Sequence, residues 1–134
     1  MKIVRTELSK DNEYYISKHN YLELKHFCMQ YPEWKQAVNN ISWLPDMPEI
    51  KVDGSINVDA VSRLAEKRED FLRRIELVER VVMETDYSLF DYILIGVTSD
   101  ISYINLRKIY EIPCCRNEYY KLYHKFFWLL SKYR

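Results

Sequence analysis

Glycine is scarce in this sequence of 134 residues, where only Gly54 and Gly96 occur. Tight hairpin turns favour glycine because their central residues adopt positive φ angles. Two glycines therefore leave few positions for a sheet of hairpin-connected strands. The apolar residues instead recur at helical spacing through most of the chain, and this pattern predicts an all-α fold.

Long hydrophobic runs and a disulfide framework are also missing. No stretch approaches the roughly 18 uninterrupted apolar residues that a membrane-spanning helix needs. The opening residues, MKIVRTELSKDNEYY, lack the apolar core of a secretory signal. The three cysteines are an odd number, and Cys114 and Cys115 are adjacent, which does not fit a framework of bridges. We therefore expect a cytoplasmic protein with no membrane partner.

The familiar motifs of catalysis and metal binding are absent as well. The sequence contains no glycine-rich phosphate loop, no GxSxG elbow and no HExxH motif. Cys114 and Cys115 could be combined with His124, but adjacent cysteines lack the spacing of about two to four residues that zinc ligands use. His26 and Cys28 face different sides of a predicted helix. We expect a protein that is not an enzyme and has no metal site and no cofactor.

A formal net charge of zero conceals a separation of charge along the chain. Residues 51–100 contain seven Lys or Arg and eleven Asp or Glu, a balance of −4. Residues 101–134 contain seven Lys or Arg and two Asp or Glu, a balance of +5. A concentrated basic segment favours an anionic partner, and nucleic acid is the commonest one.

The pattern divides the chain into an N-terminal helical segment with a linker (1–56), a long central helix (57–87) and a C-terminal unit (88–134). In the first segment, apolar residues from Tyr14 to Tyr31 fit one helical face. Pro32 should end or kink that helix, and a second helix can restart with this proline in its first turn. The linker contains two prolines, and its side chains Trp43, Leu44 and Met47 are expected to cover the core.

The most regular element is the long helix predicted from about Asn57 to Thr85. Its core positions repeat every seven residues, as Val61, Arg68, Ile75 and Val82 at one position and Leu64, Phe71, Val78 and Thr85 at the other. This pattern fits a spine against which other helices of the same chain pack. It also fits a coiled coil that joins two copies, so residues 57–87 are a candidate homodimer contact. Both can hold, with one half packed inside the subunit and the other between subunits.

Three short helices are predicted after the long one. The first begins at Ser88, with Asp91 placed three residues later as in a capping box. The second begins at Ser102 and turns inward Tyr103, Leu106, Ile109 and Tyr110. The third spans about 116–132, with an inner face of Tyr119, Leu122, Tyr123, Phe126, Leu129 and Leu130. The last two, separated by the letters EIPCC, have the proportions of a helix-turn-helix.

The last predicted helix has a basic outer face opposite its aromatic inner face. In a helix-turn-helix, this outer face enters the major groove of DNA. Arginine and lysine bind guanine edges or phosphates, asparagine binds adenine, and tyrosine can hydrogen-bond a phosphate. Together with polar residues of the preceding helix, the expected DNA-contacting residues are Ser102, Arg107, Lys108, Arg116, Asn117, Tyr120, Lys121, His124 and Lys125.

The stretch ISYINLRKIYEIPCCRNEYYKLYHKFF resembles the sigma-region-4 type of helix-turn-helix at Ser102, Tyr103, Leu106, Ile109, Ile112 and Pro113. A long helix leading into such a unit is similar to the RinA/ArpU type of small phage-encoded late-gene transcription regulators. The resemblance covers roughly residues 60–134. It implies sequence-specific binding of double-stranded DNA near a promoter and contact with RNA polymerase. The chain departs from the pattern at Cys115, where a small residue or glycine is usual in the turn.

Two other functions remain compatible with the sequence. A small DNA-packaging terminase subunit also combines a helix-turn-helix with helical oligomerisation, and a ring of eight or more copies would favour it. A protein-interaction adaptor could keep the helix-turn-helix shape without using it on DNA. The neutral total charge and the acidic residues 51–100 favour the adaptor.

Overall fold

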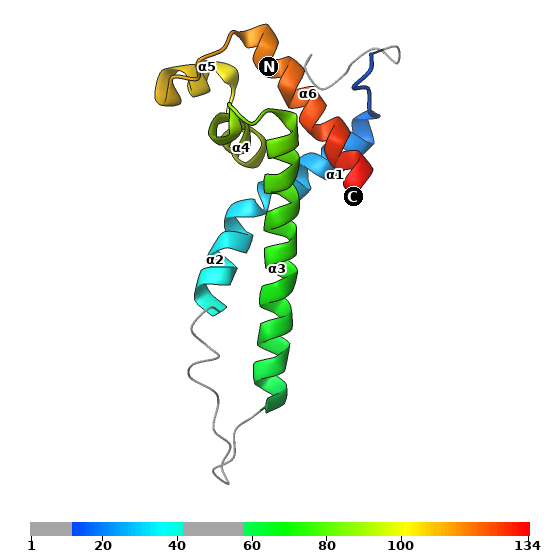
Figure 1. The fold of residues 1–134 in the computed structure, drawn as a ribbon, viewed down its shortest axis with the longest axis vertical. Helices are drawn as coiled ribbons and strands as arrows, with labels where there is room; N and C mark the ends of the chain where they lie inside the picture. Colours follow the sequence, from blue (N-terminus) through cyan, green and yellow to red (C-terminus); the bar gives the residue numbers. More distant parts are fainter. Residues whose placement is uncertain (1–11, 42–57) are drawn as a thin grey trace. The chain divides into compact units, whose positions relative to one another are not determined.

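The computed structural model describes residues 12–41 and 58–134, and these residues form helices and no strand (Figure 1). The predicted all-α class is confirmed. The expectation that Trp43, Leu44 and Met47 cover the core lies outside the described residues. The helices are α1 (Lys18–Met29), α2 (Tyr31–Ile41), α3 (Val58–Thr85), α4 (Phe90–Ser99), α5 (Tyr103–Asn105), the π-helical turn η3 (Leu106–Tyr110) and α6 (Arg116–Tyr133). Within the described part of the chain, no helix combines the length and apolarity needed to cross a membrane.

The chain divides into two compact units. The first joins Met1–Gln30 to Leu77–Arg134, and the second comprises Tyr31–Glu76. The first unit therefore contains α1, α4, α5, η3 and α6 together with the last part of α3, while the second contains α2 and the earlier part of α3. Every residue predicted to contact DNA lies in the first unit.

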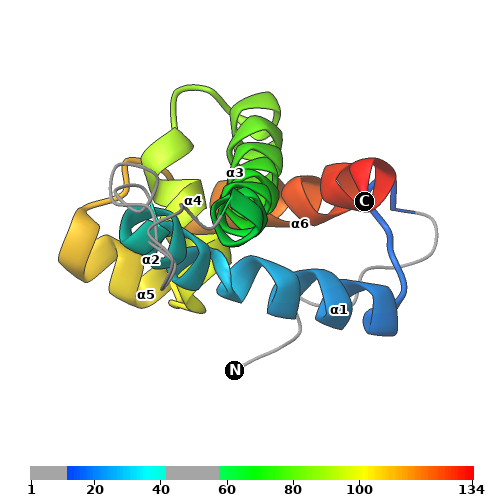
Figure 2. The same cartoon turned by 90° about the horizontal axis from the view of Figure 1, so that it is seen from below.

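Helix α1 is part of the core of the first unit, where it packs against α4 and α6 (Figure 2). Its start is fixed by Ser17, whose Oγ accepts a hydrogen bond from the Asn20 N–H at 3.2 Å. The Tyr21 and Tyr123 hydroxyls form a hydrogen bond of 2.6 Å between α1 and α6. The buried side chains of α1 recur three and four residues apart, as Tyr21, Leu24, Phe27 and Cys28. The predicted helical face of this region is confirmed at these four positions.

The start of α4 differs from the prediction. The helix begins at Phe90, and the Asp86 carboxylate accepts hydrogen bonds from the backbone N–H groups of Ser88 and Leu89 at 2.9 and 3.1 Å. The predicted capping box of Ser88 and Asp91 is therefore wrong, because Asp86 satisfies these amide groups from before the helix. The hydrogen bond from the Ser88 hydroxyl is the largest cause that lowers the pKa of Asp86.

The turn η3 changes which side chains point into the core. Leu106 and Ile112 are buried, whereas Ile109 is 63% exposed and Tyr110 is 43% exposed. The prediction that Ile109 and Tyr110 face inward is therefore wrong. It assumed α-helical spacing, but a π turn closes its hydrogen bonds over five residues. Glu111 then adopts a left-handed conformation (φ 55°) that redirects the chain, and Ile112 becomes the next core residue.

Helix α6 crosses the first unit with its apolar face inward. Four of the six residues predicted for this face are buried, while Tyr123 and Leu129 are half-buried. Phe127, which was not among them, is also buried. The buried residues of α6 are Tyr119, Leu122, Phe126, Phe127 and Leu130. The two-sided character predicted for this helix therefore holds on its inner side.

A glycine allows α6 to approach α4 closely. A Cβ added at Gly96 would collide with the Tyr119 hydroxyl oxygen and lie 3.2 Å from the Tyr119 Cζ. Tyr119 is 1% exposed and packs in one cluster with Leu106 and Ile112. The absence of a side chain at position 96 therefore creates the space that the Tyr119 ring fills.

In the second unit, α2 begins at Tyr31 and carries Pro32 in its first turn, as predicted. Its buried residues are Tyr31, Trp34 and Ile41. The Arg74 guanidinium of α3 lies 6.0 Å from the centre of the Trp34 ring, which gives a cation–π contact between the two helices.

Burial of the heptad positions increases along α3. The earlier positions are half-buried, namely Val61, Leu64, Arg68 and Phe71. The later positions are buried, namely Ile75, Val78, Val82 and Thr85. The heptad pattern therefore predicts core residues correctly in the second half of the helix and leaves partly exposed apolar side chains in the first half.

Candidate nucleic-acid interface

The first turn of α6 presents backbone donors next to a cation. Cys115, the residue before the helix, has an extended backbone (φ −78°, ψ 167°), and its side chain makes no capping hydrogen bond. This conformation needs no glycine, so the departure of the sequence at Cys115 causes no backbone strain. The N–H groups that open a helix favour an anion such as phosphate, and Arg116 supplies a positive charge at the same place.

Five of the nine residues predicted to contact DNA line one open hollow along α6. They recur at one-turn intervals, as Arg116, Asn117, Tyr120, Lys121 and His124. The hollow has a volume of about 450 Å³. Arg116 and Lys121 are exposed, whereas Tyr120 and His124 are half-buried. The structure therefore brings hydrogen-bonding groups and cations together along the outer face of α6.

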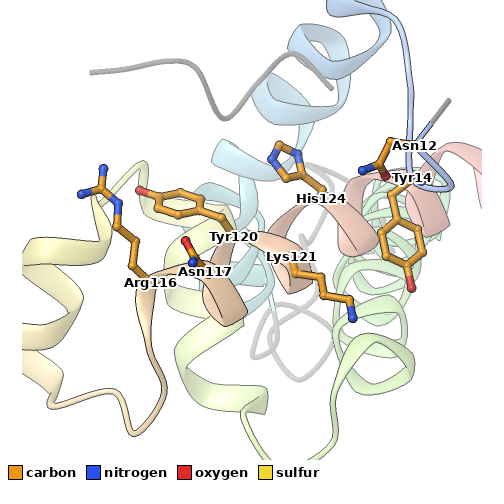
Figure 3. A pocket seen from close by; sticks show the side chains of 7 residues that line it. All are labelled: Asn12, Tyr14, Arg116, Asn117, Tyr120, Lys121 and His124. Atoms are coloured by element: carbon orange, nitrogen blue, oxygen red, sulfur yellow. Dashed lines mark hydrogen bonds between the residues drawn. The ribbon is translucent and has the colours of Figure 1, made fainter. Parts of the chain in front are cut away.

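Two residues that the sequence analysis did not select complete the hollow. Asn12 and Tyr14 line it from the segment before α1, and Figure 3 shows them at the opposite end from Arg116 and Tyr120. The Tyr14 ring lies 5.4 Å from the Trp128 ring, centre to centre, which holds this segment against α6. Tyr14 and Trp128 lie far apart in the sequence. That both are aromatic was the only feature of the sequence that could have suggested this contact.

Aromatic rings lie beside two cations of α6. The Arg116 guanidinium lies 5.8 Å from the centre of the Tyr120 ring. The Lys132 ammonium lies 4.0 Å from the centre of the half-buried Trp128 ring. A cation–π contact restricts the orientation of a cation without removing its charge. The Tyr120 ring therefore partly positions Arg116 before any partner binds.

The other four predicted residues lie elsewhere in the first unit. Ser102 caps α5, because its Oγ accepts a hydrogen bond from the Asn105 N–H at 3.3 Å. Arg107 and Lys108 are exposed on η3, and Arg107 donates a hydrogen bond to the Tyr103 hydroxyl at 3.4 Å. Lys125 is half-buried, and its charge contributes to lowering the pKa of Asp86. Lys125 does not line the hollow.

Searches against protein-family models, curated proteins and solved structures found no match to this chain.

Proposed function

We propose that this chain is a sequence-specific double-stranded DNA-binding protein that regulates transcription in a phage or prophage. The observation that supports the proposal is the two-sided character of α6. Its buried face packs into the first unit, while its outer face lines an open hollow with Arg116, Asn117 and Lys121. This combination is what a recognition helix requires, because one helix must be held by the protein and read DNA at the same time.

The outer residues of α6 have distinct roles in this proposal. Arg116 contacts a guanine edge and Asn117 contacts an adenine edge, since both side chains can make paired hydrogen bonds to these bases in the major groove. Lys121 contacts a phosphate and adds affinity without sequence preference. The free amide groups at the start of α6 hold a further phosphate and fix the angle at which the helix enters the groove.

Residues outside the hollow contact the DNA backbone in the same proposal. Ser102 is exposed at the start of α5, so it can reach a phosphate beside the groove that α6 occupies. Lys125 is assigned a smaller part than the sequence suggested, because it is half-buried and does not line the hollow. The regulator proposal includes contact with RNA polymerase, and only the family resemblance supports that contact.

A homodimer through the first half of α3 would pair two such units. The half-buried positions there, Val61, Leu64 and Phe71, keep the heptad spacing that a coiled-coil partner needs. A two-fold dimer reads two half-sites separated by one turn of DNA, about 34–36 Å, or a multiple of it. The proposal therefore predicts an operator with inverted repeats at that spacing.

DNA binding can be tested with two variants that remove the same charge at different places. In Arg116→Ala/Lys121→Ala, both cations of the hollow are lost. In Arg63→Ala/Lys67→Ala, two exposed cations of α3 are lost. Fluorescence anisotropy with genomic DNA fragments at two salt concentrations should show weaker binding by the first variant only. The slope of its log affinity against log salt concentration should become shallower by about one, since Lys121 is the phosphate contact that this variant loses.

Equal affinities of the wild type and the Arg116→Ala/Lys121→Ala variant for DNA would remove the proposal. Tight DNA binding by particles of eight or more copies in light scattering would favour the packaging subunit instead. No DNA binding by the wild-type protein, together with salt-sensitive binding of a protein partner in the absence of nucleic acid, would favour the adaptor.

A further inference from the structure

Several large apolar side chains are exposed on α5 and η3. Three large apolar side chains lie there within seven residues of sequence: Ile104 is 53% exposed, Ile109 is 63% exposed and Tyr110 is 43% exposed. A single exposed isoleucine is ordinary, but neighbouring ones indicate a surface that another molecule covers.

The π turn carries two of these side chains, and the third lies just before it. Ile109 and Tyr110 belong to η3, and Ile104 belongs to α5, which leads directly into η3. Leu106 is the fully buried residue of the same segment, and it anchors the turn to the core cluster. Within the π turn, Leu106 therefore faces the core, whereas Ile109 and Tyr110 remain exposed.

Positive charge accompanies this apolar face. Arg107 and Lys108 lie between the two isoleucines in the sequence, and both are exposed. Across the segment 102–111 they are opposed by Glu111 alone, which is also exposed. A partner that covers the isoleucines must therefore bring apolar side chains bordered by carboxylates.

We propose that the α5–η3 face, defined by Ile104, Arg107, Lys108, Ile109 and Tyr110, docks an acidic amphipathic helix of a protein partner. The apolar side of that helix covers Ile104, Ile109 and Tyr110, and its flanking Asp or Glu side chains pair with Arg107 and Lys108. This is the helix-on-surface mode of recognition, in which apolar residues supply affinity and the charges select the partner.

The charges and apolar side chains together distinguish this partner from two others. DNA would use Arg107 and Lys108, but its charged phosphates would not cover the two isoleucines with apolar groups. A second copy of the same face would cover the isoleucines but would bring its own Arg107 and Lys108 against the first pair. Like charges placed together in this way oppose association.

Two synthetic peptides test the proposal by fluorescence polarisation on the full chain. Both are helix-forming, about 18 residues long, with leucine along one face. One carries glutamate at the flanking positions, and the other carries lysine at the same positions. The glutamate peptide should bind, and the lysine peptide should bind at least about tenfold more weakly.

Variants then locate the binding. Ile104→Ser/Ile109→Ser should weaken binding of the glutamate peptide about tenfold. Lys108→Glu should reverse part of the preference between the two peptides. Met83→Ser is the matched control, because Met83 is 45% exposed on α3, away from the α5–η3 face in the sequence, and this variant should bind like the wild type. The Arg116→Ala/Lys121→Ala variant should also bind the peptide normally, which separates this site from the DNA interface.

Three results would overturn the docking proposal. The first is equal binding of the two peptides or no binding of either. The second is unchanged glutamate-peptide affinity in Ile104→Ser/Ile109→Ser. The third is a loss of self-association or of DNA affinity in that double variant without any loss of peptide binding, since this would assign the face to a second copy or to DNA.

Discussion

At the scale of single residues, Tyr119 beside Gly96 combines an unfavourable buried hydroxyl with favourable ring packing. The Tyr119 hydroxyl is buried and has no hydrogen-bond partner among the described residues. Leaving such a group unpaired costs about 1–3 kcal/mol. The ring nevertheless lies among other aromatic side chains, with centre-to-centre distances of 5.1 Å to Tyr120 and 5.8 Å to Tyr103. The favourable packing of these rings therefore opposes the cost of the unpaired hydroxyl.

We expect Gly96→Ala and Tyr119→Phe to be strongly coupled. In the wild type, the new methyl group collides with the Tyr119 hydroxyl, so Gly96→Ala should lower the free energy of unfolding by about 1–3 kcal/mol. In Tyr119→Phe the hydroxyl is gone, and the same substitution should cost at least about 1 kcal/mol less. Urea denaturation of the four proteins in this cycle measures the coupling.

Tyr103→Phe supplies the matched control for this cycle. Its hydroxyl donates to the Cys114 carbonyl oxygen at 2.5 Å and is not among the atoms nearest to Gly96. The effects of Gly96→Ala and Tyr103→Phe should therefore add. Coupling of equal size in both cycles would show that the Tyr119 hydroxyl is not the atom that requires glycine at position 96.

At the scale of elements, long regular patterns were predictable from the sequence and local exceptions were not. The predicted long helix, about Asn57 to Thr85, corresponds to α3 at Val58–Thr85. The predicted 116–132 helix corresponds to α6 at Arg116–Tyr133. Both have many turns of consistent apolar spacing, so one irregular residue does not change their bounds.

The errors occur where a short segment departs from that spacing. The π turn of η3 exposes Ile109 and Tyr110 because its hydrogen bonds skip one more residue than an α-helix allows. For the candidate site, the five α6 residues of the hollow were predictable from the sequence, because helical periodicity distinguishes inner from outer positions. Asn12 and Tyr14 were missed because their position depends on the packing of Tyr14 against Trp128, which periodicity does not encode.

Arg68 provides a prediction for helix α3. It occupies a heptad core position, is half-buried, and its Nε has no hydrogen-bond partner within the described residues. A polar residue at such a position reduces the stability of a coiled coil, so Arg68→Leu should strengthen the proposed homodimer by about tenfold or more. Sedimentation equilibrium measures the dimer dissociation constant.

Arg63→Leu is the control for this prediction, because it makes the same chemical change at an exposed position of the same helix. It should leave the dissociation constant close to that of the wild type. A monomer in all three proteins would remove the dimer proposal, and an equal effect of both substitutions would assign the change to added surface hydrophobicity.

At the scale of the whole molecule, the first unit buries several groups that lose protons only at high pH. Burial raises the pKa of the Cys28 thiol from 9.0 to about 12. Burial also raises the pKa of the Tyr21, Tyr119 and Tyr123 hydroxyls above the ordinary value of 10.0. All four groups are therefore neutral in the folded protein at pH values where the unfolded chain begins to lose their protons.

These raised pKa values predict alkaline destabilisation. Their contribution to stability is complete below the unfolded pKa of Cys28, 9.0, and is lost progressively as the pH rises toward the folded pKa values. The urea midpoint should therefore fall between about pH 8 and about pH 10.5. Cys28→Ala should make that fall smaller, although the variant starts from a lower stability because of the lost packing. A midpoint that stays constant across this range would contradict the prediction.

The hydrogen bond between Tyr21 and Tyr123 joins residues 102 positions apart, and its consequence lies in biosynthesis. A ribosome completes α1 long before it has made α4 and α6, the helices against which α1 packs. Closing so long a loop slows folding, because the entropy of closure is lost before the distant contacts form. During translation, Leu24 and Phe27 are consequently left in contact with water or a chaperone until α6 has emerged from the exit tunnel.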